Sequence, residues 1–137
     1  MPEPLNHHDA LVYVMVTVSA VDRAMTNAEL GRMGEIVSHL PVFAEYDEDQ
    51  LVKTAQACGE LLSADGGLQH VLETIRQALP RKLHETAYAV ALEVAAADLE
   101  VTPEEMRFLE LLADALGIDK LTTAAIERGV RARNMVL

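Results

Sequence analysis

The chain has 137 residues, half of them hydrophobic and 4% aromatic, with a formal net charge of −11 at pH 7. This length suits a single domain with a substantial core, and we take residues 1–137 as that domain. An acidic surface repels phosphate backbones and anionic membranes, so nucleic-acid binding is not expected. The longest apolar stretch, Ala10–Val16, is too short to insert across a bilayer.

The first half of the chain carries signals for four helices. Apolar residues at helical spacing predict a helix over Leu11–Val18, although its β-branched residues alone would also fit a strand. Thr26 and Glu29 form a capping-box pattern, which predicts that a second helix begins there. The acidic run Glu45–Asp49 suits the start of a third helix, and the Gly-containing turn at 64–67 separates it from a fourth.

The second half predicts three more helices. Pro80 ends the fourth helix and begins a fifth, which continues into the alanine-rich segment Ala87–Ala97. A second capping box, Thr102 with Glu105, starts the sixth, and the last follows the turn at 117–119. About seven helices with short links predict an all-α bundle. Few aromatics and no tryptophan agree with close helix packing.

An internal repeat relates the two ends of the chain at an offset of 76 residues. The pattern V-x-x-x-V-x-A-x-D-x-x-M-T-x-x-E spans Val14–Glu29, and the same pattern with Val for Met spans Val90–Glu105. Because the second copy is alanine-rich and reads as a helix, we expect the first to be helical too. The repeat therefore predicts two helix–turn–helix units, at about 10–40 and 86–116, related by a pseudo-twofold axis.

Each unit carries one aspartate and one glutamate at equivalent places. Asp22 and Asp98 fall where the first helix of a unit is expected to end, and Glu29 and Glu105 fall in the first turn of the next. Clustered carboxylates are the ligands that hard divalent cations prefer, so the two pairs predict two symmetric metal sites. A structural interpretation also fits, because capping boxes satisfy backbone donors without any metal. Neither copy has the loop of an EF-hand.

No catalytic residue and no organic cofactor is predicted. The sequence has no P-loop, G-x-G-x-x-G, H-E-x-x-H or G-x-S-x-G pattern. The apolar spacing around Cys58 predicts a thiol in the core. Two alternatives stay open: a structural adaptor with an exposed apolar patch, and a hydrolase that brings His39, His70 or His84 to a carboxylate.

The expected compartment is the cytoplasm. Met1–Asp9 lacks the Lys or Arg that opens a signal peptide. Cys58 is the only cysteine, so no intrachain disulfide can form, as is usual in a reducing compartment.

The paired A-x-D-x-x-[MV]-T-x-x-E units resemble the tellurite-resistance TerB-like family. The matching stretches are Ala20–Glu29 and Ala96–Glu105, and the likeness extends over about Ala10–Ile118. This resemblance implies a pseudo-twofold helical domain with a four-helix core and no firmly attached enzymatic activity. It also implies a role in tellurite resistance and chemical stress, together with protein partners that include membrane-associated members of the same system.

The resemblance further implies acidic clusters that are suspected of binding a metal ion. The positions that carry over are Asp22, Glu29, Asp98 and Glu105. The family usually has glycine directly after each aspartate, whereas this chain has Arg and Leu at 23 and 99. Because glycine supplies left-handed turn conformations, this departure affects the expected geometry of both loops.

Overall fold

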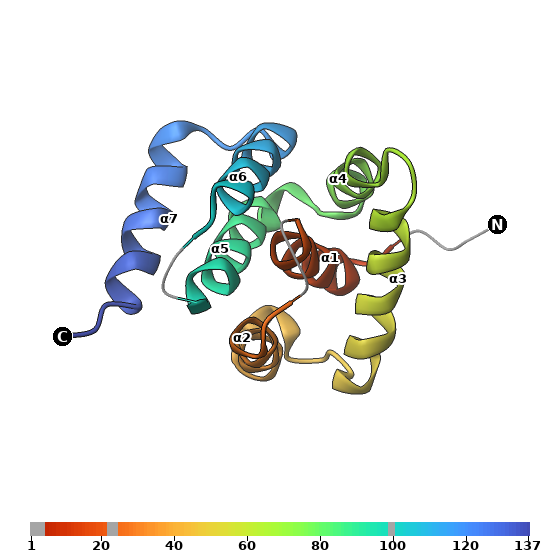
Figure 1. The fold of residues 1–137 in the computed structure, drawn as a ribbon, viewed down its shortest axis with the longest axis horizontal. Coiled ribbons are helices and arrows are strands. Elements are labelled where there is room, and N and C mark those ends of the chain that lie inside the picture. The colour runs from red at the N-terminus through yellow and green to blue at the C-terminus, as the bar shows by residue number, and fades with distance from the viewer. Residues whose placement is uncertain (1–4, 22–24, 99–100) are drawn as a thin grey trace.

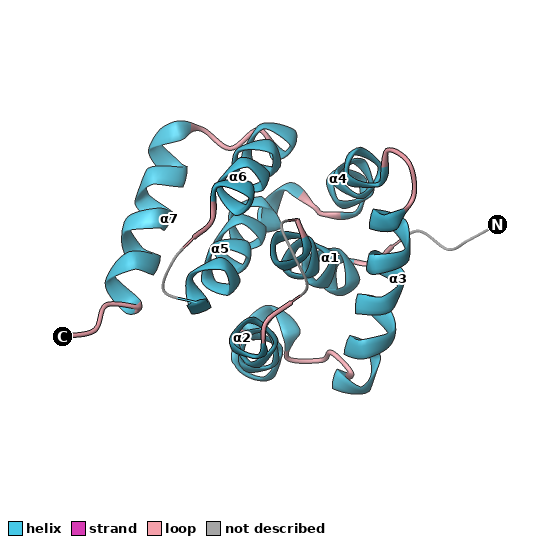
Figure 2. Ribbon diagram, viewed as in Figure 1, coloured by secondary structure: helices cyan, strands magenta, loops and turns pink. Residues whose placement is uncertain are grey.

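The computed structural model describes residues 5–21, 25–98 and 101–137. Within these ranges every regular element is helical, as Figures 1 and 2 show, which confirms the predicted all-α class. The α-helices are α1 (His7–Ala20), α2 (Asn27–His39), α3 (Leu51–Ser63), α4 (Gly67–Ala78), α5 (His84–Ala95), α6 (Pro103–Leu116) and α7 (Lys120–Arg133).

Four short 3-10 helices tighten the links between these elements. They are η1 (Pro41–Phe43), η2 (Glu48–Gln50), η3 (Arg81–Leu83) and η4 (Ala96–Asp98). Two of them begin at or directly after a proline, which cannot continue the preceding α-helix. The fourth continues α5 without a break and ends at the second of the two predicted metal-binding aspartates.

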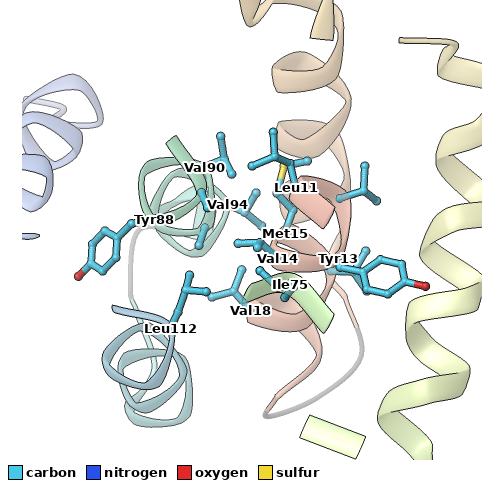
Figure 3. Close-up of a cluster of buried hydrophobic side chains, with 14 of the residues drawn as sticks. Leu11, Tyr13, Val14, Met15, Val18, Ile75, Tyr88, Val90, Val94 and Leu112 are labelled. Carbon is cyan, nitrogen blue, oxygen red and sulfur yellow. The ribbon is translucent and has the colours of Figure 1, made fainter. Parts of the chain in front are cut away.

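The centre of the molecule consists of α1 and α5, which pack against each other. All residues from Ala10 to Ser19 in α1 are buried, and so are those from Val90 to Ala95 in α5. A helix that is apolar on all sides is a buried helix. Because such a helix has no polar face to mark its period, the first segment could also be taken for a strand from its sequence. Figure 3 shows side chains of both helices, among them Met15 and Val94, meeting in this core.

The other helices surround this central pair (Figure 1). α3 and α4 pack on α1, whereas α7 packs on α5. α2 packs against α5, and α6 packs against α5, α1 and α4. Gly67 allows α4 to begin close to the end of α3, because a Cβ atom there would lie 2.3 Å from the carbonyl oxygen of Leu61.

The first turns of α2 and α6 bury a glutamate and not an apolar residue. In the sequence, the apolar residues at helical spacing begin at Leu30 and Met106, but these residues are 54% and 43% exposed. The buried position in each first turn is taken by the preceding glutamate, Glu29 or Glu105. A glutamate takes the buried position in both helices, which agrees with the repeat. The pseudo-twofold relation of the two units stays a prediction.

None of the helices in the described ranges is long and apolar enough to cross a membrane.

Candidate functional site

Two capping boxes hold the candidate glutamates in place. At the start of α2, the Thr26 backbone N–H donates to Glu29 Oε1 at 3.0 Å, and the Glu29 N–H donates to Thr26 Oγ1 at 3.1 Å. At the start of α6, Thr102 and Glu105 repeat this pair of bonds at 2.9 and 3.1 Å. Each carboxylate therefore lies at the positive end of a helix dipole, which favours its charged form.

The structure brings Glu29 and Glu105 together. Glu29 is 2% exposed and Glu105 is 3% exposed, and their carboxyl groups interact directly. The pKa of Glu105 is raised to about 7, mainly by burial and in smaller part by the Glu29 carboxyl. The capping bonds from Thr102 act in the opposite direction and lower this pKa.

This arrangement differs from two separate Asp–Glu corners, since the glutamates of the two units lie at one shared place. Asp22 lies outside the described residues. Asp98 ends η4, and its side chain is also outside what the structure describes. η4 packs against α2, which carries Glu29, so the segment that ends in Asp98 lies next to the other unit's glutamate-bearing helix.

A pair of buried carboxyl groups can share a proton or bind a cation. Two desolvated carboxylates disfavour each other's charge, and oxygen ligands of this kind suit Ca²⁺ or Mg²⁺. The described residues contain no group of three or more His, Cys, Asp or Glu side chains with metal-binding geometry. A complete ligand set would therefore need groups beyond the two glutamates.

A third buried carboxylate, Glu93 of α5, lies between two arginines. Arg32 Nη1 of α2 lies 3.0 Å from Glu93 Oε2, and Arg133 Nη1 of α7 lies 2.8 Å from Glu93 Oε1. Arg32 Nη1 also donates to Asn134 Oδ1 at 3.0 Å. The network joins α2, α5 and the end of α7. Sequence patterns did not single it out, although Glu93 is the only charged residue in the stretch 87–97.

The remaining candidate residues, Cys58, His84 and His39, have surroundings that suit a structural role. Cys58 is fully buried, which confirms the predicted core thiol, and burial raises the pKa of this thiol to about 11. The two ring nitrogens of His84 lie 3.0 Å from the Leu116 carbonyl oxygen and 3.3 Å from that of Leu79. His39 Nδ1 lies 3.0 Å from a backbone carbonyl oxygen of its own helix. These described histidine contacts are to backbone oxygens and not to carboxylates.

The geometry defines a class of protein: an all-α domain in which two capped helix N-termini share a buried carboxyl pair. The family model described as "Tellurite resistance protein TerB" matches residues 8–128. The chain therefore belongs to the TerB family, as the resemblance of its repeated acidic motif implied. No curated protein and no solved structure matches the chain.

Proposed function

We propose that this TerB-family chain is a non-catalytic domain that holds one divalent cation at the carboxyl pair and acts by binding a partner protein. The burial of Glu29 against Glu105 carries this proposal. Two such groups destabilise the folded chain when both are charged, unless a proton or a cation neutralises them. A divalent cation offsets both charges at once, and its binding free energy then stabilises the fold.

The proposed ligand set joins the two repeat units. The capping bonds use Oε1 of each glutamate, and a carboxylate has a second oxygen with which it can bind a cation. We assign the remaining protein ligands to Asp22 and Asp98, which follow the first helix of each unit in the sequence. The packing of η4 on α2 supports one site shared by both units in preference to two separate sites.

The family supports the proposed biological setting. Membership of a tellurite-resistance family favours a role in the response to chemical stress, with a membrane-associated protein of the same system as partner. We place the domain in the cytoplasm, because a chain with a single cysteine, which cannot form an intrachain disulfide, suits a reducing compartment.

Thermal melting in the presence of metal ions tests the cation. The wild-type chain is stripped with EDTA and melted with Ca²⁺, Mg²⁺, Mn²⁺ or Zn²⁺ at increasing concentrations. At least one ion should raise the melting temperature, because a ligand present at 100 times its Kd stabilises the fold by about 2.7 kcal/mol. The shift should disappear in Asp98→Ala and in Glu105→Gln.

The matched control is Glu104→Gln, which removes an exposed carboxylate from the same helical turn. This variant should keep the whole metal-dependent shift. An unchanged melting curve with all four ions would remove the cation from the proposal and leave Glu29 and Glu105 as capping residues only.

A further inference from the structure

The helix α7 contributes little to the hydrophobic core. The structure describes all 14 of its residues, and Val130 is the one among them that is buried. α6, which has the same length, buries six residues, among them Phe108 and Leu112. Most of the stability of a helix in a protein comes from the packing of its apolar face. α7 is therefore held to the bundle by much less apolar burial than α6.

Two grooves lie beside α7, one towards α2 and one towards α6. The first, of about 860 Å³, is lined by residues of α7, α5 and α2, and the second, of about 460 Å³, by residues of α7, α5 and the start of α6. Val130 and Asn134 line both grooves. In Figure 1, α7 stands at the edge of the molecule. Near its end, α7 thus contacts α5 along a narrow line between two open spaces, without the close packing of a core helix.

Polar contacts supply part of the remaining attachment of α7. Tyr88 Oη of α5 donates a hydrogen bond to Glu127 Oε1 of α7 at 2.6 Å. At the end of α7, Arg133 Nη1 lies 2.8 Å from Glu93 Oε1. The Arg133 side chain is 74% exposed, and ion pairs with such exposed groups add little to stability. These contacts position α7 on α5 but do not replace the missing apolar burial.

Release of α7 would not leave a buried charge without a partner. Glu93, the carboxylate to which the end of α7 is tied, is 7% exposed. Arg32 Nη1 of α2 lies 3.0 Å from Glu93 Oε2. Breaking a buried ion pair is costly mainly because it leaves an uncompensated charge. Since Arg32 stays with Glu93 when α7 leaves, the opening of α7 avoids this cost.

An apolar strip of α5 and η4 lies beneath α7. Tyr88, Leu92 and Ala96 follow one another at i, i+4 spacing, so they share one face and form what we call the α5 strip. Leu92 and Ala96 line the smaller groove together with Val130 of α7 and the 43% exposed Met106. In Figure 3 the Tyr88 side chain points away from the side chains of α1. Opening of α7 would therefore uncover a continuous apolar surface of the kind that marks interaction sites.

We propose that α7 is a detachable cover, which opens and closes while α1 to α6 stay folded and thereby controls access to the α5 strip. The hinge is the turn at 117–119, where Gly117 has a φ of 69°, a conformation that suits glycine. Elements that open separately from the rest of a fold are those with few buried apolar contacts. This inference goes beyond the proposed function and does not depend on the cation.

Hydrogen exchange of backbone amides, followed by NMR in metal-free buffer with increasing urea, tests the cover. A helix of 14 residues is marginal in water once it is detached, so the amides of α7 exchange when it opens. They should exchange at least about 10-fold faster than the slowest amides of α1, after correction for intrinsic rates. Urea should accelerate this exchange less steeply than that of α1, because opening exposes the α5 strip and not the whole core.

Two substitutions of similar cost separate the opening of α7 from unfolding of the whole chain. Tyr88→Phe removes a hydrogen bond that is lost both when α7 opens and when the chain unfolds, so it should accelerate exchange in α7 and in α1 by about 5-fold each. Ile75→Val weakens buried contacts of α4, which stay intact when α7 opens. It should therefore accelerate the slowest amides of α1 by about 5-fold and leave those of α7 within about 2-fold.

Three results would overturn the proposal. If Ile75→Val accelerates α7 as much as α1, then α7 opens only together with the whole chain. If Tyr88→Phe leaves the α7 amides unchanged, or if their exchange does not respond to urea, then α7 does not leave the α5 strip. The urea series on the wild-type chain decides alone if a variant fails to fold. The metal-dependent melting shift is measured separately, so failure of the cover and failure of the cation site are distinguishable.

Discussion

Replacing Glu105 with glutamine tests the physical basis of the carboxyl pair. Glutamine has nearly the same shape and can still accept the capping bond from Thr102, since Glu and Gln both serve at this position. It cannot carry the buried charge. In metal-free buffer at pH 8, Glu105→Gln should therefore be more stable than the wild-type chain, although it alters a buried residue.

The size of the effect follows from the pKa of Glu105. A rise from its usual 4.5 to about 7 corresponds to about 3 kcal/mol, at about 1.36 kcal/mol per pKa unit. The amide of a buried glutamine keeps part of the desolvation cost, so we expect a gain of about 1–2 kcal/mol. Because this pKa is raised in the folded state, the contribution of Glu105 to stability is most favourable below about pH 4.5 and is lost as the pH increases through about 7.

Urea unfolding between pH 4.5 and 8.5 in EDTA measures both quantities. The contribution of Glu105 to the wild-type pH dependence should be missing in Glu105→Gln, while the exposed-site control Glu104→Gln should follow the wild-type curve. If Glu105→Gln is no more stable than the wild-type chain at pH 8, or keeps the same pH dependence, then burial against Glu29 does not destabilise the charged form and the reasoning is wrong.

Substitutions at Thr102 and Arg32 test two further contacts of the fold. Thr102→Ala removes the side-chain cap of α6 and should cost about 1 kcal/mol in urea unfolding, whereas Thr102→Ser should cost much less because it keeps the hydroxyl. Arg32→Met leaves Glu93 buried with the largely exposed Arg133 as its remaining cation, and should cost about 2–4 kcal/mol. An Arg32→Met variant as stable as the wild-type chain in urea would show that Arg32 does not offset the buried charge.

Local signals in the sequence predicted much of the fold. The capping boxes at Thr26 and Thr102 fix where α2 and α6 begin, because their hydrogen bonds involve residues only three positions apart. The helical interpretation of the valine-rich first segment came from its alanine-rich counterpart. Its local preference alone was ambiguous, because tertiary burial on all sides decides its structure.

The site itself depends on contacts that no local pattern contains. The sequence indicated Glu29 and Glu105 as candidates, but their meeting depends on how the two units pack against each other. The exposure of Leu30 and Met106 also does not follow from the sequence, since helical spacing does not show which side of the first turn faces the core. For Glu93 a signal was present, because a single charge within an apolar helix usually has a buried partner.

The number of ions bound per chain tests the central claim most directly. In isothermal titration of the metal-stripped chain, using the cation that raises its melting temperature, we predict one ion per chain. Glu29→Gln and Glu105→Gln should each abolish its binding, because the two glutamates belong to a single site. Binding of two ions, or loss of only half of the bound ions in either variant, would contradict a shared site and favour two independent acidic corners.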